Sequence, residues 1–120
     1  MLNDGGSFSK VILAVGYTDL RRGIEGLASI VKFKYNLDPH EKNVLFLFCG
    51  TRSDRIKGLL WEGDGFLLLY KRLDQGAFSW PRTTNEAIQL TREQYRLLMD
   101  GLSIVARRPI KEIEAPPEIA

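Results

Sequence analysis

The sequence predicts an α+β domain, in which two helices accompany a mainly antiparallel sheet. Three observations predict this fold class. Residues 43–49 (NVLFLFC) are continuously apolar, as in a central strand that is covered on both faces. Residues 55–62 and 66–73 flank a Gly-Asp-Gly turn at residues 63–65, which is a strong hairpin signal. A capping-box pattern, T-x-x-Q from Thr91, precedes a helical pattern.

The N-terminal third of the chain predicts one strand and one helix. Residues 10–15 (KVILAV) are short, apolar and rich in β-branched side chains, which favours a strand that ends at Gly16. Thr18 or Asp19 is the expected N-cap of the helix that follows. The i, i+3, i+4, i+7 spacing predicts its buried face, which comprises Ile24, Leu27, Ala28, Val31 and Tyr35.

The C-terminal third predicts a short strand, a candidate for one more strand, and the second helix. The strand is expected at residues 77–80, before Pro81, and the further candidate lies at residues 87–90. The helix is expected to end at Gly101 and to bury one face, formed by Tyr95, Leu98, Met99 and Leu102. The expected order is β-α-β-β-β-β-α.

Length and composition predict a single domain. The chain has 120 residues, of which 44% are hydrophobic and 27% charged, as in ordinary soluble domains and unlike disordered or collagen-like chains. We expect a flexible N-terminus over residues 1–9, one domain over residues 10–105 and an extended tail over residues 106–120.

Several classes of protein and site are excluded by the residues present. No apolar run approaches the roughly 18 residues that a membrane helix needs, and the N-terminus lacks a signal-peptide pattern, so a cytoplasmic protein is expected. A single cysteine, Cys49, excludes an internal disulfide, and a single histidine, His40, leaves little material for a zinc site. No cofactor or metal is expected.

The hairpin predicts a basic surface. A loop of two or four residues puts Lys57 opposite Tyr70 and Arg55 opposite Arg72 on one face of the sheet, while Lys71 lies on the other face. Like charges directly opposite each other repel, and a bound phosphate would relieve that repulsion.

Two alternatives weaken this interpretation of the hairpin. In the first, Asp54, Glu62 or Asp74 neutralises the basic cluster locally. In the second, a three-residue loop at residues 63–65 shifts the register and disperses the cluster.

A second basic pair, Arg21 and Arg22, precedes the first predicted helix. Backbone amides at a helix N-terminus attract anions, so this pair is a candidate phosphate contact. The alternative is a solvated pair, or one that is neutralised by Asp19 or Glu25.

Four motifs in order resemble those of one protein family. They are TDLRRGIEGL from Thr18, DRIK from Asp54 followed by LWE and Gly65, YKRL from Tyr70, and FSWP from Phe78. Together they are similar to the TnpB accessory proteins of the insertion-sequence-66 group of bacterial transposons, over about residues 11–101. The chain departs from the family pattern at Gly50, where Asn is frequent, and at Gly58, where a larger apolar residue is usual.

The resemblance implies a helper in DNA transposition that is encoded beside a larger transposase, with strand-transfer chemistry in the transposase. We therefore expect a non-catalytic protein that binds DNA phosphates at transposon ends with little sequence preference. The residues expected to bind nucleic acid are Arg21, Arg22, Arg55, Lys57, Lys71 and Arg72.

Two other functions are open at this point. The chain could instead be an interaction module that docks on the transposase without touching DNA, with Trp61, Tyr70 and Trp80 as candidate contacts on an exposed apolar patch. Homo-oligomers are compatible with either function. A metal-dependent nuclease is less favoured, because the available carboxylates, Asp19, Asp54, Glu62 and Asp64, resemble turn formers.

Overall fold

The computed structural model describes residues 8–102 and residue 104 of the chain. In chain order the elements are β1 (Lys10–Ala14), α1 (Ile24–Ser29), the π-helix η2 (Ile30–Lys34), β2 (Val44–Cys49), β3 (Arg55–Trp61), β4 (Phe66–Arg72), β5 (Ala87–Leu90) and α2 (Arg92–Met99).

The five strands form one sheet with the order β4-β3-β2-β1-β5. Among the strands of residues 8–102, only β1 and β2 pair in parallel, and the other three strand pairings are antiparallel. The predicted α+β class with a mainly antiparallel sheet is confirmed. A parallel pair needs a long crossover, and the segment between β1 and β2 supplies it and carries α1 and η2.

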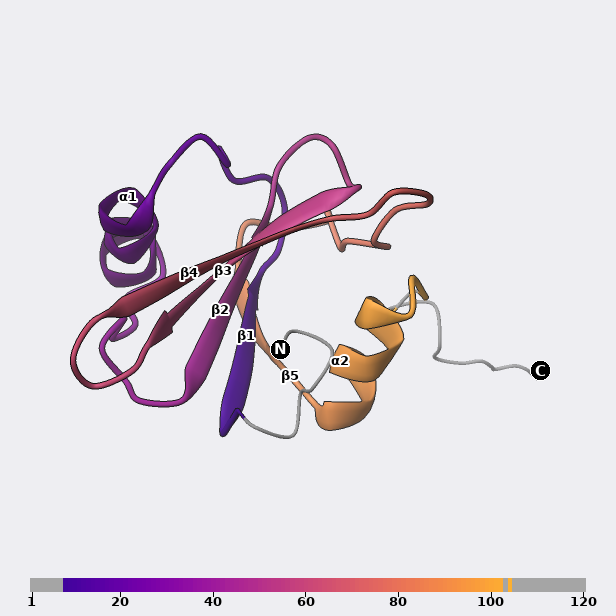
Figure 1. The fold of residues 1–120 in the computed structure, drawn as a ribbon. Helices are drawn as coiled ribbons and strands as arrows, with labels where there is room; N and C mark the ends of the chain where they lie inside the picture. Colours follow the sequence, from indigo (N-terminus) through magenta and orange to yellow (C-terminus); the bar gives the residue numbers. More distant parts are fainter. Residues whose placement is uncertain (1–7, 103, 105–120) are drawn as a thin grey trace.

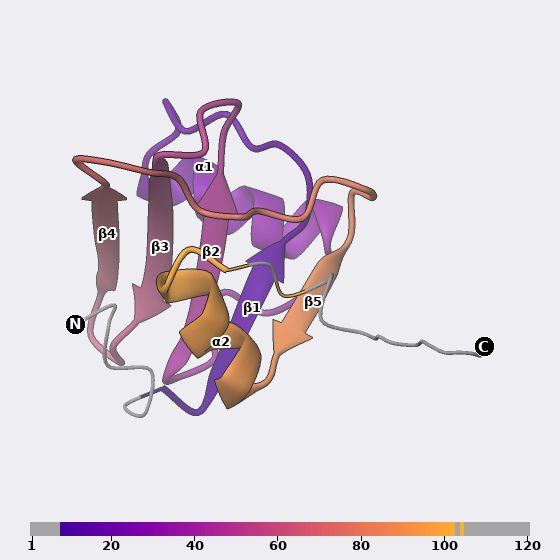
Figure 2. The same ribbon diagram turned by 90° about the vertical axis from the view of Figure 1, so that its right-hand side faces the viewer.

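The helices cover opposite faces of the sheet (Figure 1, Figure 2). Leu27 of α1 and Val31 of η2 share one apolar cluster with Phe46 and Phe48 of β2. On the other face, Leu98 of α2 packs with a second cluster that includes residues of β1, β2 and β3. All six residues of β2 are buried because its side chains alternate between these two clusters, as the apolar run predicted.

The β3–β4 hairpin has the predicted register. Gly63 has a φ of 99°, and the Glu62 amide donates to the Gly65 carbonyl at 2.9 Å, which closes a two-residue loop. Only glycine readily takes positive φ at the first loop position of such a turn. Trp61 therefore pairs with Phe66 and Arg55 pairs with Arg72, so the three-residue loop alternative is wrong.

Residues 77–80 do not form the predicted strand. The Trp80 amide donates to the Phe78 carbonyl at 3.0 Å, and such a short-range bond bends the chain out of the extended form. The segment is held by other bonds. The Phe78 amide donates to the Ser53 carbonyl at 2.7 Å, and Trp80 Nε1 donates to the Ala14 carbonyl at 3.0 Å.

The first helix begins later than predicted. Its N-cap is Gly23, and neither Thr18 nor Asp19 caps it. The Asp19 side chain is engaged elsewhere, because its Oδ1 accepts bonds from the Arg21 amide and from Arg21 Nε. The helix also ends in a π-turn, in which the Tyr35 amide donates to the Ile30 carbonyl at 3.2 Å.

The second helix begins as predicted. Thr91 Oγ1 accepts from the Gln94 amide at 3.0 Å, and Gln94 Oε1 accepts from the Thr91 amide at 2.9 Å, which completes the capping box. The helix ends before Gly101, as expected. Its buried face differs from the prediction at two positions, because Leu97 is buried and Leu102 is 44% exposed.

Part of the predicted domain organisation lies outside the described residues. This applies to the tail at residues 106–120 and to residues 1–7 of the expected flexible N-terminus. Within the described part of the chain, no helix combines the length and the apolar character that crossing a membrane demands.

Replacing Thr91 by Ala is expected to lower the free energy of unfolding by about 1 kcal/mol, because the capping box loses its hydroxyl acceptor. Urea denaturation followed by circular dichroism measures the change. Thr83→Ala, at an exposed loop position, is the matched control and should leave the free energy within about 0.5 kcal/mol. Equal effects of the two substitutions would contradict a stabilising cap.

Candidate nucleic-acid interface

An open pocket of about 820 Å³ lies where the chain leaves β1 and β2 and enters β3. Three segments form its walls: residues 17–21 after β1, residues 50–52 after β2, and the end of the β3–β4 hairpin that lies away from its turn. Its charged and aromatic lining consists of Arg21, Arg52, Arg55, Lys57, Asp19, Tyr17 and Tyr70.

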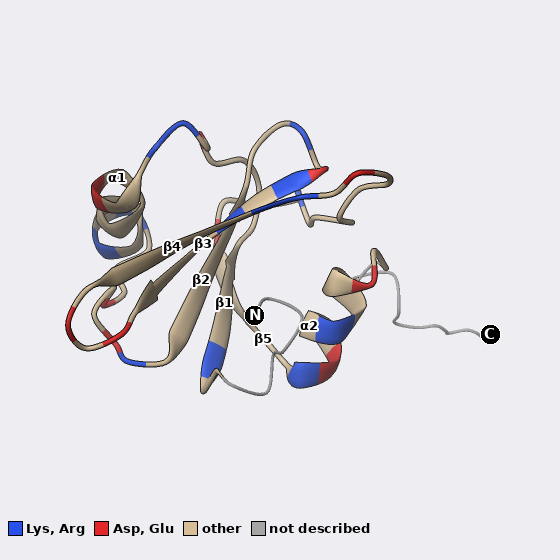
Figure 3. Ribbon diagram, viewed as in Figure 1, with Lys and Arg blue, Asp and Glu red and all other residues tan. Residues whose placement is uncertain are grey.

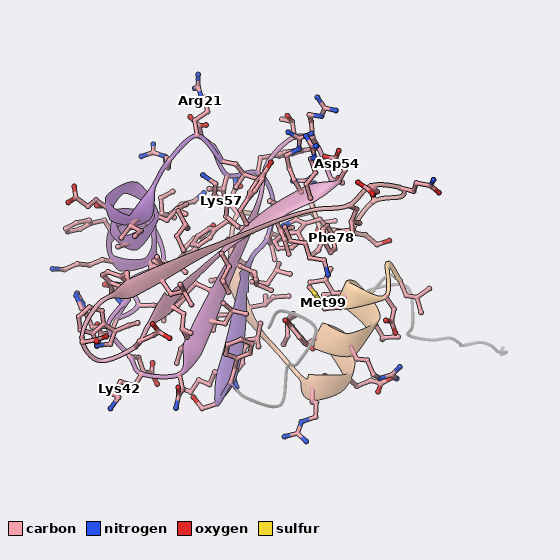
Figure 4. The ribbon with its side chains drawn as sticks, in the orientation of Figure 1. Arg21, Lys42, Asp54, Lys57, Phe78 and Met99 are labelled. Carbon is pink, nitrogen blue, oxygen red and sulfur yellow. The ribbon has the colours of Figure 1, made fainter. Side chains whose placement is uncertain are left out.

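The sheet places the hairpin residues of the pocket on one face. Arg55 and Lys57 alternate with the core residue Ile56, and Tyr70 lies directly opposite Lys57. Figure 3 shows the basic segments before α1, between β2 and β3, and at the adjoining ends of β3 and β4 together at one end of the molecule. In Figure 4, Arg21 and Lys57 lie toward this end, whereas Lys42 lies at the opposite end.

The two loops of the pocket are joined by a close backbone contact. The Thr18 amide donates to the Cys49 carbonyl at 2.9 Å. A Cβ atom added at Gly50 would lie 3.3 Å from the Thr18 carbonyl oxygen, so a larger residue there would require a small shift of the neighbouring backbone. Gly50 therefore suits the close approach of the walls in this chain.

Two carboxylates bind arginines of the pocket. Arg21 donates to Asp19 through Nε and Nη2, each at 2.9 Å. Arg55 donates to Asp54 through the same two atoms, at 2.9 and 3.2 Å. The hydrogen bond from Arg21 lowers the pKa of Asp19 to about 2, and the bond from Arg55 lowers the pKa of Asp54.

The positive charge of the pocket is only partly compensated. Its four cations face the two carboxylates of Asp19 and Asp54, which leaves two positive charges in excess. Arg52 is 4.0 Å from Asp54 and remains 72% exposed, while Lys57 Nζ donates to the Arg22 carbonyl at 3.1 Å. The local-neutralisation alternative is thus correct for Asp54 with Arg55, but Glu62 and Asp74 form no ion pair among the described residues.

The structure does not bring all the predicted nucleic-acid residues together. Arg21, Arg55 and Lys57 line the pocket. Arg72 lies opposite Arg55 on β4 but does not line the pocket. The Arg22 carbonyl accepts a hydrogen bond from Lys57. Neither Arg22 nor Arg72 pairs with a carboxylate in the described part of the chain. Lys71 lies opposite Ile56, whose side chain faces the α2 side of the sheet, because neighbouring strand residues point to opposite faces.

The aromatic residues predicted as partner contacts are also separated. Tyr70 is 55% exposed in the pocket. Trp80 is 6% exposed, so the expectation of a surface Trp80 is wrong: the ring fills the core and its Nε1 is bonded to the Ala14 carbonyl. Trp61 is partly buried near the hairpin turn, where its ring lies 4.8 Å from that of His40 and 4.9 Å from that of Phe66.

Arg82 is a site residue that the sequence reasoning missed. Its Nη1 donates to the Gly16 carbonyl at 2.7 Å, and its Nη2 donates to Ser53 Oγ at 3.0 Å and to Cys49 Sγ at 3.4 Å. Its guanidinium also lies 4.1 Å from the centroid of the Tyr17 ring. Arg82 therefore connects the ends of β1 and β2. The buried Cys49 thiol beside it has a raised pKa because burial disfavours the thiolate.

Tyr17 and Arg52 were missed as well, although the sequence holds a signal for them. Both follow strands, and the carboxyl ends of parallel strands meet at one edge of a sheet, where ligands commonly bind. Recognising β1 and β2 as a parallel pair would have identified the segments after Gly16 and after Cys49 as one surface.

The carboxylates named for a nuclease do not form one cluster. Asp19 and Asp54 bind arginines, whereas Glu62 and Asp64 lie at the hairpin turn, beyond the seven residues of β3. Among residues 8–102 and 104, no group of three or more His, Cys, Asp or Glu side chains is placed to hold a metal ion.

Comparison with known proteins identifies relatives along most of the chain. The family model described as IS66 Orf2-like protein matches residues 9–109. The chain is 33% identical over 104 residues to uncharacterized protein y4jC of Sinorhizobium fredii, which covers 85% of this chain and 88% of that protein. It is 37% identical over 93 residues to uncharacterized protein y4hO of the same organism, covering 78% and 80%. No solved structure matches.

The Asp19 carboxyl is expected to titrate with a pKa of about 2, and Arg21→Gln should return this pKa toward 3.8 because the bond that stabilises the carboxylate is lost. The pair's contribution to stability is therefore fully present above about pH 4 and is lost as the pH falls through about 2. Carbon-detected NMR of the carboxyl groups measures the titration.

Arg96→Gln, which removes a guanidinium from Glu93 on α2, is the control and should leave the pKa of Asp19 unchanged. A pKa of Asp19 that is insensitive to Arg21→Gln would contradict the geometry of the pocket.

Proposed function

This chain belongs to the family of IS66 Orf2-like proteins, which are associated with an insertion sequence, and we propose that it is a non-catalytic helper of DNA transposition that binds DNA phosphates in its basic pocket. The observation that carries this proposal is the excess of positive charge in a concave surface formed by three segments. Lys and Arg side chains bind the phosphate backbone by releasing counterions, which needs no base recognition.

The two arginine–aspartate pairs support phosphate binding rather than cancel it. A guanidinium has five N–H donors, and each pair uses donors of Nε and Nη2 only. Arg21, whose side chain is 91% exposed, has its remaining donors available to phosphate oxygens, whereas Arg55 is 24% exposed and lies beside the Tyr70 hydroxyl. The carboxylates also fix the orientation of the guanidinium groups, so less side-chain entropy is lost when a phosphate binds.

Arg52 and Lys57 extend the same surface with charges that no carboxylate holds closely. The Arg52 side chain is 72% exposed, and Lys57 Nζ donates to the Arg22 carbonyl oxygen and forms no ion pair with the described residues. Phosphate contacts of this kind position a protein on DNA without reading its sequence. We therefore expect weak sequence preference and strong dependence on salt.

Docking on the transposase of the same element stays a prediction. Docking was expected to use an exposed apolar patch. Trp80 is not part of such a patch because it is buried in the core, and Trp61 is partly covered by His40 and Phe66. A transposase partner is compatible with DNA binding, since the two surfaces need not overlap. Cytoplasmic location and homo-oligomer formation stay predictions in the same way.

Duplex DNA binding at low salt is expected, and log K should fall with log salt concentration with a slope no steeper than about −4, because four cations line the pocket. Arg52→Ala should weaken binding and make the slope shallower by about 1. Fluorescence anisotropy of a labelled duplex over a salt series measures both quantities.

Arg92→Ala is the matched control, because Arg92 is an exposed arginine at the start of α2 and does not line the pocket. It should leave the slope unchanged. Absence of duplex binding at low salt, or equal effects of the two substitutions, would overturn the proposed function.

A further inference from the structure

The pocket contains two exposed tyrosines among its cations. Tyr17 is 56% exposed and Tyr70 is 55% exposed, whereas most other aromatic side chains in the described part of the chain are at least partly buried. Exposed aromatic rings within a basic groove are the arrangement by which proteins bind single-stranded nucleic acid, since bases stack on the rings and the backbone lies along the cations.

We propose that the pocket binds unpaired DNA, with bases stacked on Tyr17 and Tyr70 and the adjoining phosphates on the arginines and Lys57. This inference rests on the proposed function, and it adds the kind of DNA that the site prefers. The added contacts are with the faces of the bases, which a protein that binds only phosphates does not touch.

Tyr17 is held in a position suited to stacking. The Arg82 guanidinium lies 4.1 Å from the ring centroid and so covers one face of the ring. Arg82 is itself fixed by its bonds to the Gly16 carbonyl and to Ser53 Oγ. The exposed part of Tyr17 is therefore available on a ring that is already oriented, which reduces the entropy that stacking costs.

The backbone at Gly16 contributes to this placement. Gly16 has a φ of 93°, and a Cβ atom there would lie 2.8 Å from the Thr84 carbonyl oxygen. Glycine alone fits both conditions, so the chain can turn sharply after β1 and present Tyr17 in the wall of the pocket.

Tyr70 lies on another wall of the pocket and belongs to the edge strand β4. It faces Lys57 across the hairpin, and together with Asp54, which has the larger effect, it raises the pKa of Arg55. Its hydroxyl therefore lies beside a guanidinium that we expect to bind phosphate. A base stacked on Tyr70 would have its own phosphate within the cationic part of the pocket.

The shape of the pocket favours single strands over duplexes. A volume of about 820 Å³ lies within the range of about 300–1,000 Å³ that is typical of pockets for small organic groups. Bases in a duplex are stacked on one another and offer only their edges, so their faces become accessible to side chains only after unpairing. A duplex can therefore use the cations at the rim but not the two tyrosine rings.

The test compares a labelled twelve-residue oligothymidylate with an abasic oligonucleotide of the same length, which carries the same phosphates but no bases. Anisotropy at low salt should show about tenfold tighter binding of the oligothymidylate, which corresponds to about 1.4 kcal/mol. Tyr17→Ala and Tyr70→Ala should each reduce this difference, and the double variant should abolish it. Tyr17→Phe and Tyr70→Phe retain the rings and should retain the preference.

Phe33→Ala is the matched control, because Phe33 is 77% exposed on η2 and does not line the pocket. It should leave both affinities unchanged. The single-residue variants are checked by thermal unfolding, and the comparison of the oligothymidylate with the abasic strand on the unaltered protein can still overturn the proposal if an alanine variant fails to fold.

The outcomes separate this inference from the proposed function. Equal binding of the oligothymidylate, the abasic strand and a duplex would overturn base stacking but leave phosphate binding intact. Loss of the preference in Phe33→Ala as well as in the tyrosine variants would also overturn it. Absence of binding to all three DNAs would overturn both the inference and the proposed function.

Discussion

The parallel pairing of β1 with β2 organises both the sheet and the pocket at its edge. It requires a long crossover, which the chain uses for α1 and η2, and it buries β2 between helices on both faces of the sheet. It also brings the carboxyl ends of the two strands to one edge. The loops that follow, residues 17–21 and residues 50–52, therefore meet there and form two walls of the basic pocket. The hairpin completes the pocket because β3 pairs with β2 on the side away from β1.

The charged residues of the pocket have two roles: the carboxylates orient arginine side chains, and the excess cations attract a polyanion. Asp19 and Asp54 each hold one arginine through two hydrogen bonds, and both carboxylates are stabilised in their ionised form. Such pairs on a protein surface contribute little to stability, so their value here lies in fixing the direction of the guanidinium groups. The cations that lack a close carboxylate, Arg52 and Lys57, supply the excess charge. A polyanion would thus meet a surface that is already partly ordered.

Arg82 links the fold to the site. Its guanidinium satisfies the Gly16 carbonyl at the end of β1 and contacts Cys49 and Ser53 around the end of β2, while its plane lies over Tyr17. One side chain therefore holds two loops and orients one ring. Trp80 lies two residues before Arg82 and is buried in the core. Its Nε1 donates to the Ala14 carbonyl, so it also holds the end of β1. The segment at residues 77–82 is held by separate backbone bonds to the Ser53 carbonyl and the Gly16 amide, and by the side chains of Trp80 and Arg82, and it does not form a strand.

Local rules of turn geometry, strand alternation and helix capping were enough to predict several parts of the molecule from the residues. The Gly63 turn and the alternation of strand side chains were enough to predict that Arg55 and Lys57 share a face with Tyr70, and the pattern at Thr91 was enough to predict the start of α2. The motifs also indicated the family. Tertiary structure alone decided which cations converge, because the contacts concerned join residues far apart in the chain: Arg82 lies 66 residues from Gly16 and 33 residues from Cys49. It likewise decided that Trp80 is buried and that Asp19 binds Arg21 instead of capping a helix. The burial of Trp80 and the contacts of Arg82 depend on partners far apart in the chain, which only folding brings within reach. Asp19 and Arg21 are neighbours in the sequence, and there the fold decides only that the helix begins after Gly23, so that Asp19 has no helix N-terminus to cap.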